Sequence, residues 1–276
     1  MTALRRTNIT LRTATATFAF AFALLIAASA LAGPPLATDD TGTVDVGKVE
    51  IELNGAYTYD KETDFGVTTK CSRADAEMKI TTGLYRNLGI SLAIPYEINE
   101  RVKEDNQPSE EASGFGDMTV EVKYAFAELA GISFAIKPSV IMPTGDYSDG
   151  LSEGRWQFGT TLIATREFEE GKYALHANLG YEHHDYRNDE ARDSSRNNLW
   201  SGSIAGEAEV AKGLFVVAET GLATTADKTT DEISACATVG ARYEINDFLD
   251  INAGVKLGLT KPEDDVSVLY GLVLKI

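Results

Sequence analysis

Ionisable side chains stand at every second position in several apolar stretches of this chain. The stretch 73–79 places an arginine, two acids and a lysine at alternate positions, and 117–123 does the same with two acids and a lysine. Successive residues of a strand point to opposite faces, so each stretch has one charged and one apolar face. Such a charged face either neutralises itself by ion pairing across a narrow space or lines a wet, ion-selective path.

The same two-residue period recurs along the chain and predicts about twelve strands. They are expected at 49–59, 73–84, 90–98, 117–126, 132–142, 156–164, 172–184, 200–210, 214–222, 233–243, 249–259 and 266–276. Short connections alternate with long polar ones near 61–70, 100–116, 144–154, 185–198, 223–232 and 260–265. Alternating loop lengths, an even strand number and aromatic residues near the strand ends are typical of bacterial outer-membrane barrels. We therefore predict an all-β fold, a transmembrane antiparallel up-and-down barrel spanning residues 47–276.

Residues 1–32 are predicted to be a secretory signal peptide. Arg5, Arg6 and Arg12 precede an apolar run, and Ala30-Leu31-Ala32 is an A-x-A cleavage signal. The alternative is an N-terminal membrane anchor, although the run is shorter than the ~20 residues that a spanning helix needs. The mature chain would then begin with a short periplasmic segment, residues 33–46, ahead of a barrel in the outer membrane of a Gram-negative bacterium.

The charge of the chain excludes one class of partner. It has 25 basic and 42 acidic residues, and without the three signal arginines the net charge is about −20. Nucleic-acid binding needs a basic surface, so no nucleic-acid partner is expected. The expected partners are outer-membrane lipid and lipopolysaccharide, a small-molecule solute and the barrel assembly machinery, with the oligomeric state left open.

The charged face is predicted to line the barrel lumen. Twelve residues are candidates for this lining: Arg73, Asp75, Glu77, Lys79, Glu97, Asp117, Glu121, Lys123, Lys137, Glu182, Arg242 and Lys256. Eight-stranded barrels are filled with side chains, whereas barrels of sixteen or more strands hold aqueous channels. Twelve strands fall between these limits, so an open lumen and a plugged lumen both remain possible readings.

Two prolines interrupt predicted strands. Pro95 and Pro138 lie near mid-strand on either side of the strand expected at 117–126. Proline donates no ladder hydrogen bond and belongs at bulges or edges. We predict kinks in the wall at both prolines. One hypothesis is a weakened wall that gives apolar solutes a lateral exit, and the alternative is two harmless bulges.

Catalytic, metal and redox chemistry find little support. His183 is expected on the lipid-facing side, where the neighbouring outward positions hold Trp200, Gly202 and Ile204 rather than a nucleophilic serine. His183 and His184 point to opposite faces and cannot easily share one ion. We predict no enzyme activity, no metal and no cofactor. Cys71 and Cys236 fall on strands that are not neighbours, so a disulfide would need a folded loop, and two isolated thiols are the alternative.

Four segments resemble one known family. They are Gly33–Asp40, Thr43-Val44 followed by Gly47–Ile51, Gly114–Asp117 followed by Val122-Lys123-Tyr124, and Pro143–Asp146 with Gly150 and Gly154. Together they resemble the outer-membrane barrel family labelled as transporters of the meta-pathway of phenol degradation. The chain departs from that pattern at Leu36, where an aromatic residue is usual. Residues 270–276 also resemble the C-terminal assembly signal of outer-membrane proteins, except that Ile276 replaces the usual aromatic residue.

The resemblance implies a transporter or channel in the outer membrane. We expect passage of small molecules, including aromatic or hydrophobic ones. The alternative is a non-conducting structural barrel that acts through its extracellular loops.

Overall fold

A computed structural model describes residues 34–64, 67–104 and 113–276. The predicted signal peptide, and with it the cleavage point before Gly33, lies outside the described residues. Among the residues that are described, no helix is both long enough and apolar enough to cross a bilayer.

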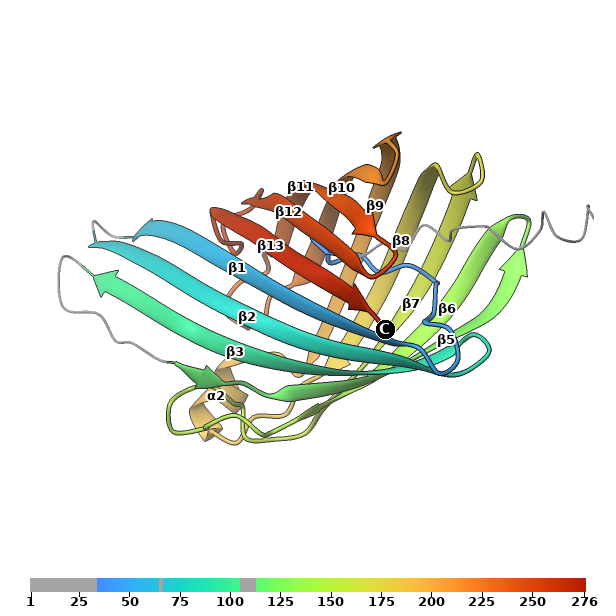
Figure 1. Cartoon of the computed structure of the whole chain (residues 1–276). Coiled ribbons are helices and arrows are strands. Elements are labelled where there is room, and N and C mark those ends of the chain that lie inside the picture. The colour runs from blue at the N-terminus through green and yellow to red at the C-terminus, as the bar shows by residue number, and fades with distance from the viewer. Residues whose placement is uncertain (1–33, 65–66, 105–112) are drawn as a thin grey trace, which may run out of the picture.

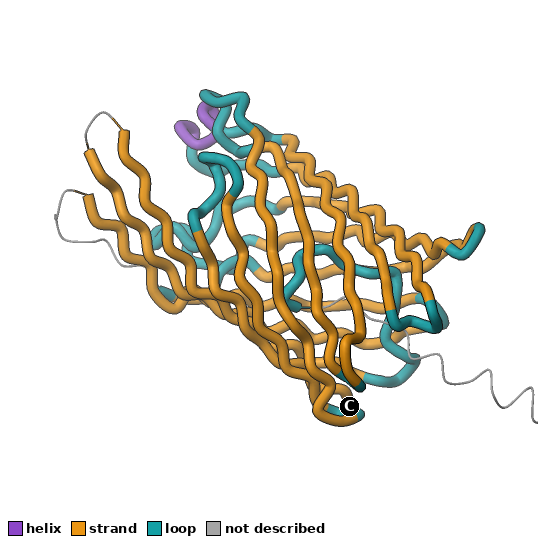
Figure 2. Tube along the Cα trace, turned by 90° about the horizontal axis from the view of Figure 1, so that it is seen from above, coloured by secondary structure: helices purple, strands orange, loops and turns teal. Residues whose placement is uncertain are grey.

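Twelve antiparallel strands close into one barrel, which confirms the predicted fold class (Figures 1 and 2). β1 pairs with both β13 and β2, and the pairing of β2 with β3 completes the circle. The staves are β1 (Val49–Asp64), β2 (Val67–Tyr85), β3 (Leu88–Glu104), β5 (Met118–Leu129), β6 (Ile132–Met142), β7 (Gln157–Phe168), β8 (Tyr173–His183), β9 (Asn198–Ala211), β10 (Leu214–Thr224), β11 (Ile233–Asn246), β12 (Leu249–Gly258) and β13 (Val266–Lys275). The two-residue β4 (Gly114–Phe115) pairs only with β3, beside the start of β5.

The barrel has an inverted distribution of polarity. Its buried side chains include Glu52, His176, Glu207, Arg242 and Asp250, whereas large apolar side chains on every barrel strand except β6 are exposed on the outside. A water-soluble sandwich buries its apolar face, so this arrangement suits a wall surrounded by lipid.

Strands β1, β2 and β3 are longer than the sequence pattern indicated, and they extend past the other staves (Figure 1). The loop predicted at 61–70 is largely a hairpin, because pairing continues to Asp64↔Val67. The Thr63 and Thr68 hydroxyls lie 3.1 Å apart across it. Both faces of this hairpin are polar, and such a strand gives no alternation of apolar and polar residues to detect.

The loop predicted at 185–198 contains one turn of helix, α2 (Asp189–Ser194). The Asn188 side chain accepts a hydrogen bond from the Glu190 N–H at 2.8 Å and caps the helix. Asp189 and Glu190 place negative charge in the first turn, which favours a helix start.

Residues 34–46, called the N-terminal segment below, lie inside the barrel. The sequence predicts a segment that precedes the barrel; the structure places its residues within the lumen. The segment starts near mid-height and ends where Val46 pairs with Gly83, beside the short turns, at what is called the short-turn end below. Leu36 packs against Ala205, Phe215 and Val217, which form the apolar cluster of the interior. The opposite rim, which carries the long connections, is called the long-loop end.

Candidate functional site

The N-terminal segment is held by a cluster of charges at the middle of the lumen. Asp39 Oδ1 lies 2.7 Å from Lys123 Nζ, and Asp39 Oδ2 lies 2.9 Å from Lys137 Nζ. Lys137 also pairs with Glu121 at 3.2 Å, and Glu121 pairs with Lys79 at 3.4 Å. The alternation in β2, β5 and β6 sends all four of these strand side chains to one face, as the sequence predicts. Asp39 lies between Lys137 and Lys123, so it links them into a continuous series of ion pairs that starts at Lys79 and Glu121.

Backbone groups of the segment are also bonded to the wall. Glu219 of β10 accepts hydrogen bonds from the Ala37 N–H at 3.1 Å and from the Thr38 N–H at 2.8 Å. The Thr38 hydroxyl lies 2.8 Å from Ser203 Oγ on β9. The side-chain amide of Asn178 can bond both the N–H and the carbonyl of Asp39, at 2.7 and 2.9 Å. These contacts reach β8, β9 and β10, and the ion pairs of Asp39 reach β5 and β6, so the segment spans the lumen and does not lie along one strand.

The two adjacent carboxyl groups of the segment have opposite electrostatics. Burial by itself would raise the pKa of Asp39, but the ammonium groups of Lys123, Lys137 and Lys79 bring it well below its usual range. Burial raises the pKa of Asp40 to about 7, and the attraction of Lys123, 4.0 Å away, offsets it only in part. Asp39 is therefore an anion in the site, whereas Asp40 exchanges its proton near neutral pH.

A second charge cluster lies in the lumen, on strands β9, β11 and β12. The Arg242 guanidinium contacts Glu244 at 3.0 Å, Glu207 at 3.4 Å and Asp250 at 3.8 Å. It also lies over the Phe215 ring, 4.4 Å from the centroid. Arg242, Glu207 and Asp250 are almost completely buried, so water has little access to this cluster.

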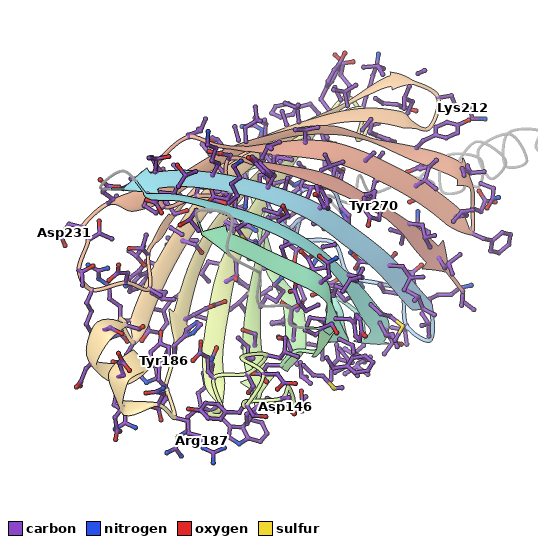
Figure 3. All side chains as sticks on the ribbon, turned by 90° about the vertical axis from the view of Figure 1, so that its left-hand side faces the viewer. Asp146, Tyr186, Arg187, Lys212, Asp231 and Tyr270 are labelled. Carbon is purple, nitrogen blue, oxygen red and sulfur yellow. The ribbon has the colours of Figure 1, made fainter. Side chains whose placement is uncertain are left out.

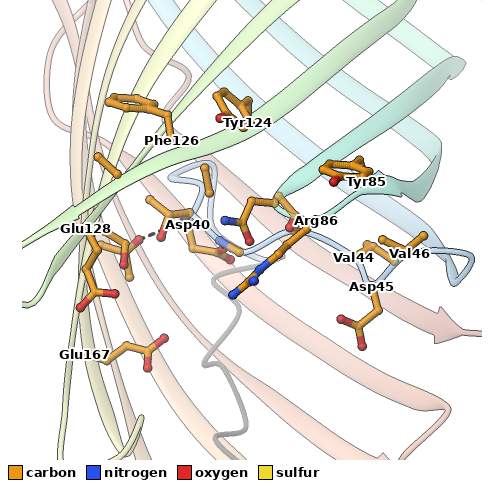
Figure 4. Close-up of a pocket in the computed structure, with 18 residues that line it drawn as sticks. Asp40, Val44, Asp45, Val46, Tyr85, Arg86, Tyr124, Phe126, Glu128 and Glu167 are labelled. Carbon is orange, nitrogen blue, oxygen red and sulfur yellow. Dashed lines mark hydrogen bonds between the residues drawn. The ribbon is translucent and has the colours of Figure 1, made fainter.

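In the part of the chain that the structure describes, cavities follow the lumen from one end toward the other. At the short-turn end, a cavity of about 690 Å³ is lined by residues 40–46 of the segment, by Arg86 and by Glu167 (Figure 4). The middle cavity, of about 220 Å³, borders the segment from Leu36 to Val44 and the lysine cluster. A third, of about 490 Å³, lies toward the long-loop end and meets the middle one at Glu77. The N-terminal segment thus stands between the first two cavities.

The remaining candidate lumen residues lie nearer the long-loop end. Arg73 pairs with Asp264 at 3.0 Å, and Lys256 pairs with Glu263. The cavity of about 490 Å³ is lined by Asp75, Glu77, Glu97 and Asp117. Glu182 accepts from His184 at 2.8 Å. The twelve candidates therefore divide into the mid-lumen cluster, the separate Arg242 cluster and this outer, mostly acidic group.

The two prolines do not share a face. Pro95 lines the outer cavity, and its carbonyl accepts a hydrogen bond from the Gly116 N–H at 3.1 Å. It follows the last β3–β5 pair, Ala93↔Thr119. Tyr96, on the outward face of β3, also lines this cavity, which therefore reaches the outer surface of the wall. Pro138 is exposed on the outside of β6 and pairs with Thr160.

Other candidate chemistries are placed as follows. His183 bonds Asn198 at 3.1 Å, and His184 bonds Glu182, so the adjacent histidines have separate partners. Cys71 on β2 and Cys236 on β11 do not form a disulfide with each other. Within residues 34–64, 67–104 and 113–276, no group of three or more His, Cys, Asp or Glu side chains could hold a metal ion.

Sequence reasoning missed the residues that obstruct the lumen. Asp39 and Asp40 entered it only as part of a family-like segment, because residues 34–46 have no strand period. The alternation does predict that Glu207 and Glu219 point inward, but the sequence does not indicate which inward acids contact the N-terminal segment. The Asp39-Asp40 pair, together with lysines at inward strand positions, is the sequence signal that could have suggested the contact of this segment with Lys123 and Lys137.

Solved structures with the same fold support the barrel assignment. The chain is similar to the COG4313 outer membrane channel from Pseudomonas putida F1, with a TM-score of 0.71 and 15% identity over 89% of this chain and 100% of that chain. It is also similar to the NanC porin (TM-score 0.55, 13% identity, 82% and 100% covered) and the KdgM porin (TM-score 0.51, 9% identity, 82% and 98% covered). At these identities the likeness shows the fold alone.

Comparisons of sequence give one clear result. The search of curated proteins found no match. A family model described as "Putative MetA-pathway of phenol degradation" matches residues 37–276, which is nearly the whole described chain. The chain belongs to this family, as the resemblance of its four segments indicated.

Proposed function

We propose that this protein is an outer-membrane channel for small solutes, closed at rest by its own N-terminal segment. The observation that carries the proposal is the position of that segment between two cavities of one lumen. The channel and porin names of proteins with this fold support the general role. In the outer membrane, the short turns would face the periplasm and the long loops the outside.

Aromatic or hydrophobic solutes suit the proposed channel. The family description names phenol degradation. The outer cavity combines acidic side chains with Pro95, Tyr96, Ile141 and Leu151, which offer apolar contact to a small ring. Such a mixture of apolar lining and a few polar groups is typical of small-molecule sites.

The N-terminal segment is suited to movement because it belongs to no stave. Residues 34–41 make no strand pairing, and their contacts to the wall are side-chain hydrogen bonds, ion pairs and the packing of Leu36. The ladders that close the barrel run from β1 to β13 and from β2 to β3 without them. The segment can therefore leave the lumen without breaking the wall.

A disulfide staple tests whether the segment is the gate. Thr38 Oγ1 lies 2.8 Å from Ser203 Oγ, so T38C and S203C, made in a C71S/C236S background, can bond the segment to β9. In planar bilayers we expect few openings under oxidising conditions and frequent openings after addition of a reductant. Equal conductance in both states would contradict the proposal.

The matched control is a staple within the wall. Thr58 Oγ1 and Ser267 Oγ lie 2.9 Å apart on the paired strands β1 and β13. T58C/S267C in the same background forms a disulfide without touching the segment, so its conductance should not respond to the reductant.

The alternative is a non-conducting barrel that acts through its long loops. The loops do form a structured surface, since Arg196 donates to the carbonyls of Thr225 and Thr230, and Arg187 lies 4.7 Å from the Tyr147 ring centroid. Asp146, Tyr186, Arg187 and Asp231 lie toward this end, and Lys212 marks the opposite turn (Figure 3). Silence of every variant, including the reduced T38C/S203C, would favour this alternative.

A further inference from the structure

We propose that Lys123 and Lys137 form a carboxylate-binding site in the lumen, which Asp39 occupies at rest. A small solute that carries a carboxylate competes with Asp39 for the two lysines and thereby releases the N-terminal segment. This inference rests on the proposed channel function and names the chemical class of the solute.

The geometry is that of one carboxylate bridging two ammonium groups. Each oxygen of Asp39 has its own lysine, at 2.7 Å for Lys123 and 2.9 Å for Lys137. The lysines come from the neighbouring strands β5 and β6, and all three side chains are at most 19% exposed. The Lys123 contact is a charge-assisted hydrogen bond, which is a strong class of hydrogen bond, and the Lys137 contact is a close ion pair.

Departure of the segment leaves the site with unmatched charge. In the part of the chain that the structure describes, both ion pairs of Lys123 go to Asp39 and Asp40. Lys137 keeps Glu121. Removing one partner of a buried pair is strongly unfavourable, because the remaining charge is left without compensation. An incoming anion that takes the place of Asp39 removes this cost, so anion binding and opening are thermodynamically linked.

The surroundings favour a carboxylate over other ligands. Glu121 lies 3.2 Å from Lys137, and it would repel a doubly charged phosphate more than a monoanion. A neutral phenol or amide brings no charge for Lys123. The adjoining cavity of about 220 Å³ is at the small end for ligand sites, so the body of the solute has to be small. Benzoate is a suitable probe, and benzamide is its neutral counterpart.

The first experiment measures channel opening in planar bilayers with the refolded mature chain. Benzoate should raise the open probability of the unmodified protein, and benzamide should not. The Asp39→Asn variant should open frequently without benzoate and respond little to it. K123Q and K137Q each lose one of the ion pairs that hold Asp39, so they should also open more often without benzoate, and benzoate should change their open probability less than in the unmodified chain. Lys212→Gln, in the exposed turn between β9 and β10, is the matched control and should respond normally.

The second experiment measures benzoate binding without conductance, by equilibrium dialysis of the refolded protein in detergent. Asp39→Asn should bind benzoate more tightly than the unmodified chain, because the internal competitor has lost its charge. The double variant D39N/K123Q should lose this gain of affinity. Heat-modifiable gel migration checks that each variant is folded.

Several outcomes would overturn the carboxylate site. They are an equal response to benzamide, an equal response to chloride, or affinities that do not change in the lysine variants. In those cases the reduction-dependent opening of T38C/S203C would still stand, and only the ligand class would be wrong. If neither the reduced staple nor Asp39→Asn conducts, the proposed channel function itself fails.

Discussion

Asp39 and Asp40 are adjacent in sequence, yet the pKa values of their carboxyl groups are shifted in opposite directions. Asp39 faces two lysines and stays ionised. Asp40 is 1% exposed, accepts from the Gly42 N–H, and has its pKa raised by burial to about 7. Asp39 thus holds the N-terminal segment to the lysines at any pH near neutral, whereas the contribution of Asp40 to docking depends on pH.

The open probability of the channel should rise with pH. In the docked segment Asp40 keeps its proton up to about pH 7, whereas a free aspartate loses it near pH 4. Docking therefore takes up a proton between these values, and it weakens as pH rises through this window. We expect more frequent openings at about pH 8 than at about pH 5, measured in planar bilayers.

The Asp40→Asn variant should remove this pH dependence and stay mostly closed, since asparagine resembles the protonated acid. Asp146→Asn is the control, because Asp146 lies on a long loop and bonds the Ser148 N–H at 2.8 Å. A pH profile of Asp40→Asn that matches the unmodified chain would contradict the role of Asp40.

At the scale of elements, the base of the N-terminal segment depends on a close approach to β2. A Cβ atom added at Gly83 would collide with the carbonyl oxygens of Val44 and Asp45. Gly83→Ala should therefore displace the segment and raise the open probability, without the loss of any ladder bond.

Gly89→Ala is the matched control for this change. Gly89 pairs with Gly83 across β2 and β3, but its added Cβ would meet only the Thr82 carbonyl at 3.4 Å, an ordinary contact. Equal conductance of the two variants would show that the close approach at Gly83 does not hold the gate.

The wall near Pro95 gives a test of lateral exit. β3 leaves β5 at Ala93, and Pro95 then lines a cavity that reaches Tyr96 on the outward face. Pro95→Val restores a ladder donor and should reduce uptake of a hydrophobic probe into liposomes, while uptake of a polar probe is unchanged. Pro138→Val, on the outward face of β6, should change neither uptake. Unchanged uptake of the hydrophobic probe in Pro95→Val would contradict a lateral exit.

The strands were predictable because their signal is local, whereas the position of the N-terminal segment was not. A period of two residues marks the staves, and the alternation of short turns with long connections indicates their order. The N-terminal segment has no period, and its partners Lys123, Asn178 and Glu219 come from strands far apart in sequence. Only the closed barrel brings those side chains to one place. The extension of β1 and β2 was missed for a different reason, since neither face of that hairpin is apolar.

At the scale of the whole molecule, residues 34–41 take no part in the strand ladders that close the barrel. A variant that lacks residues 34–41 keeps every strand pairing, so it should still refold into a barrel whose gel migration changes on heating. It should also conduct steadily and show no response to pH between about 5 and about 8, because Asp39 and Asp40 are absent. Failure of this variant to refold would mean that the segment is part of the folding core.

The short connection between Asp39 and β1 has a quantitative consequence for transport. A group tethered by a few residues competes with free ligands as if it were present at a high local concentration, on the order of millimolar. A free carboxylate must reach a comparable concentration outside before it displaces Asp39. The channel would then stay closed at low solute concentration and open only above a threshold concentration. The length of the tether between Asp39 and β1 would set that threshold.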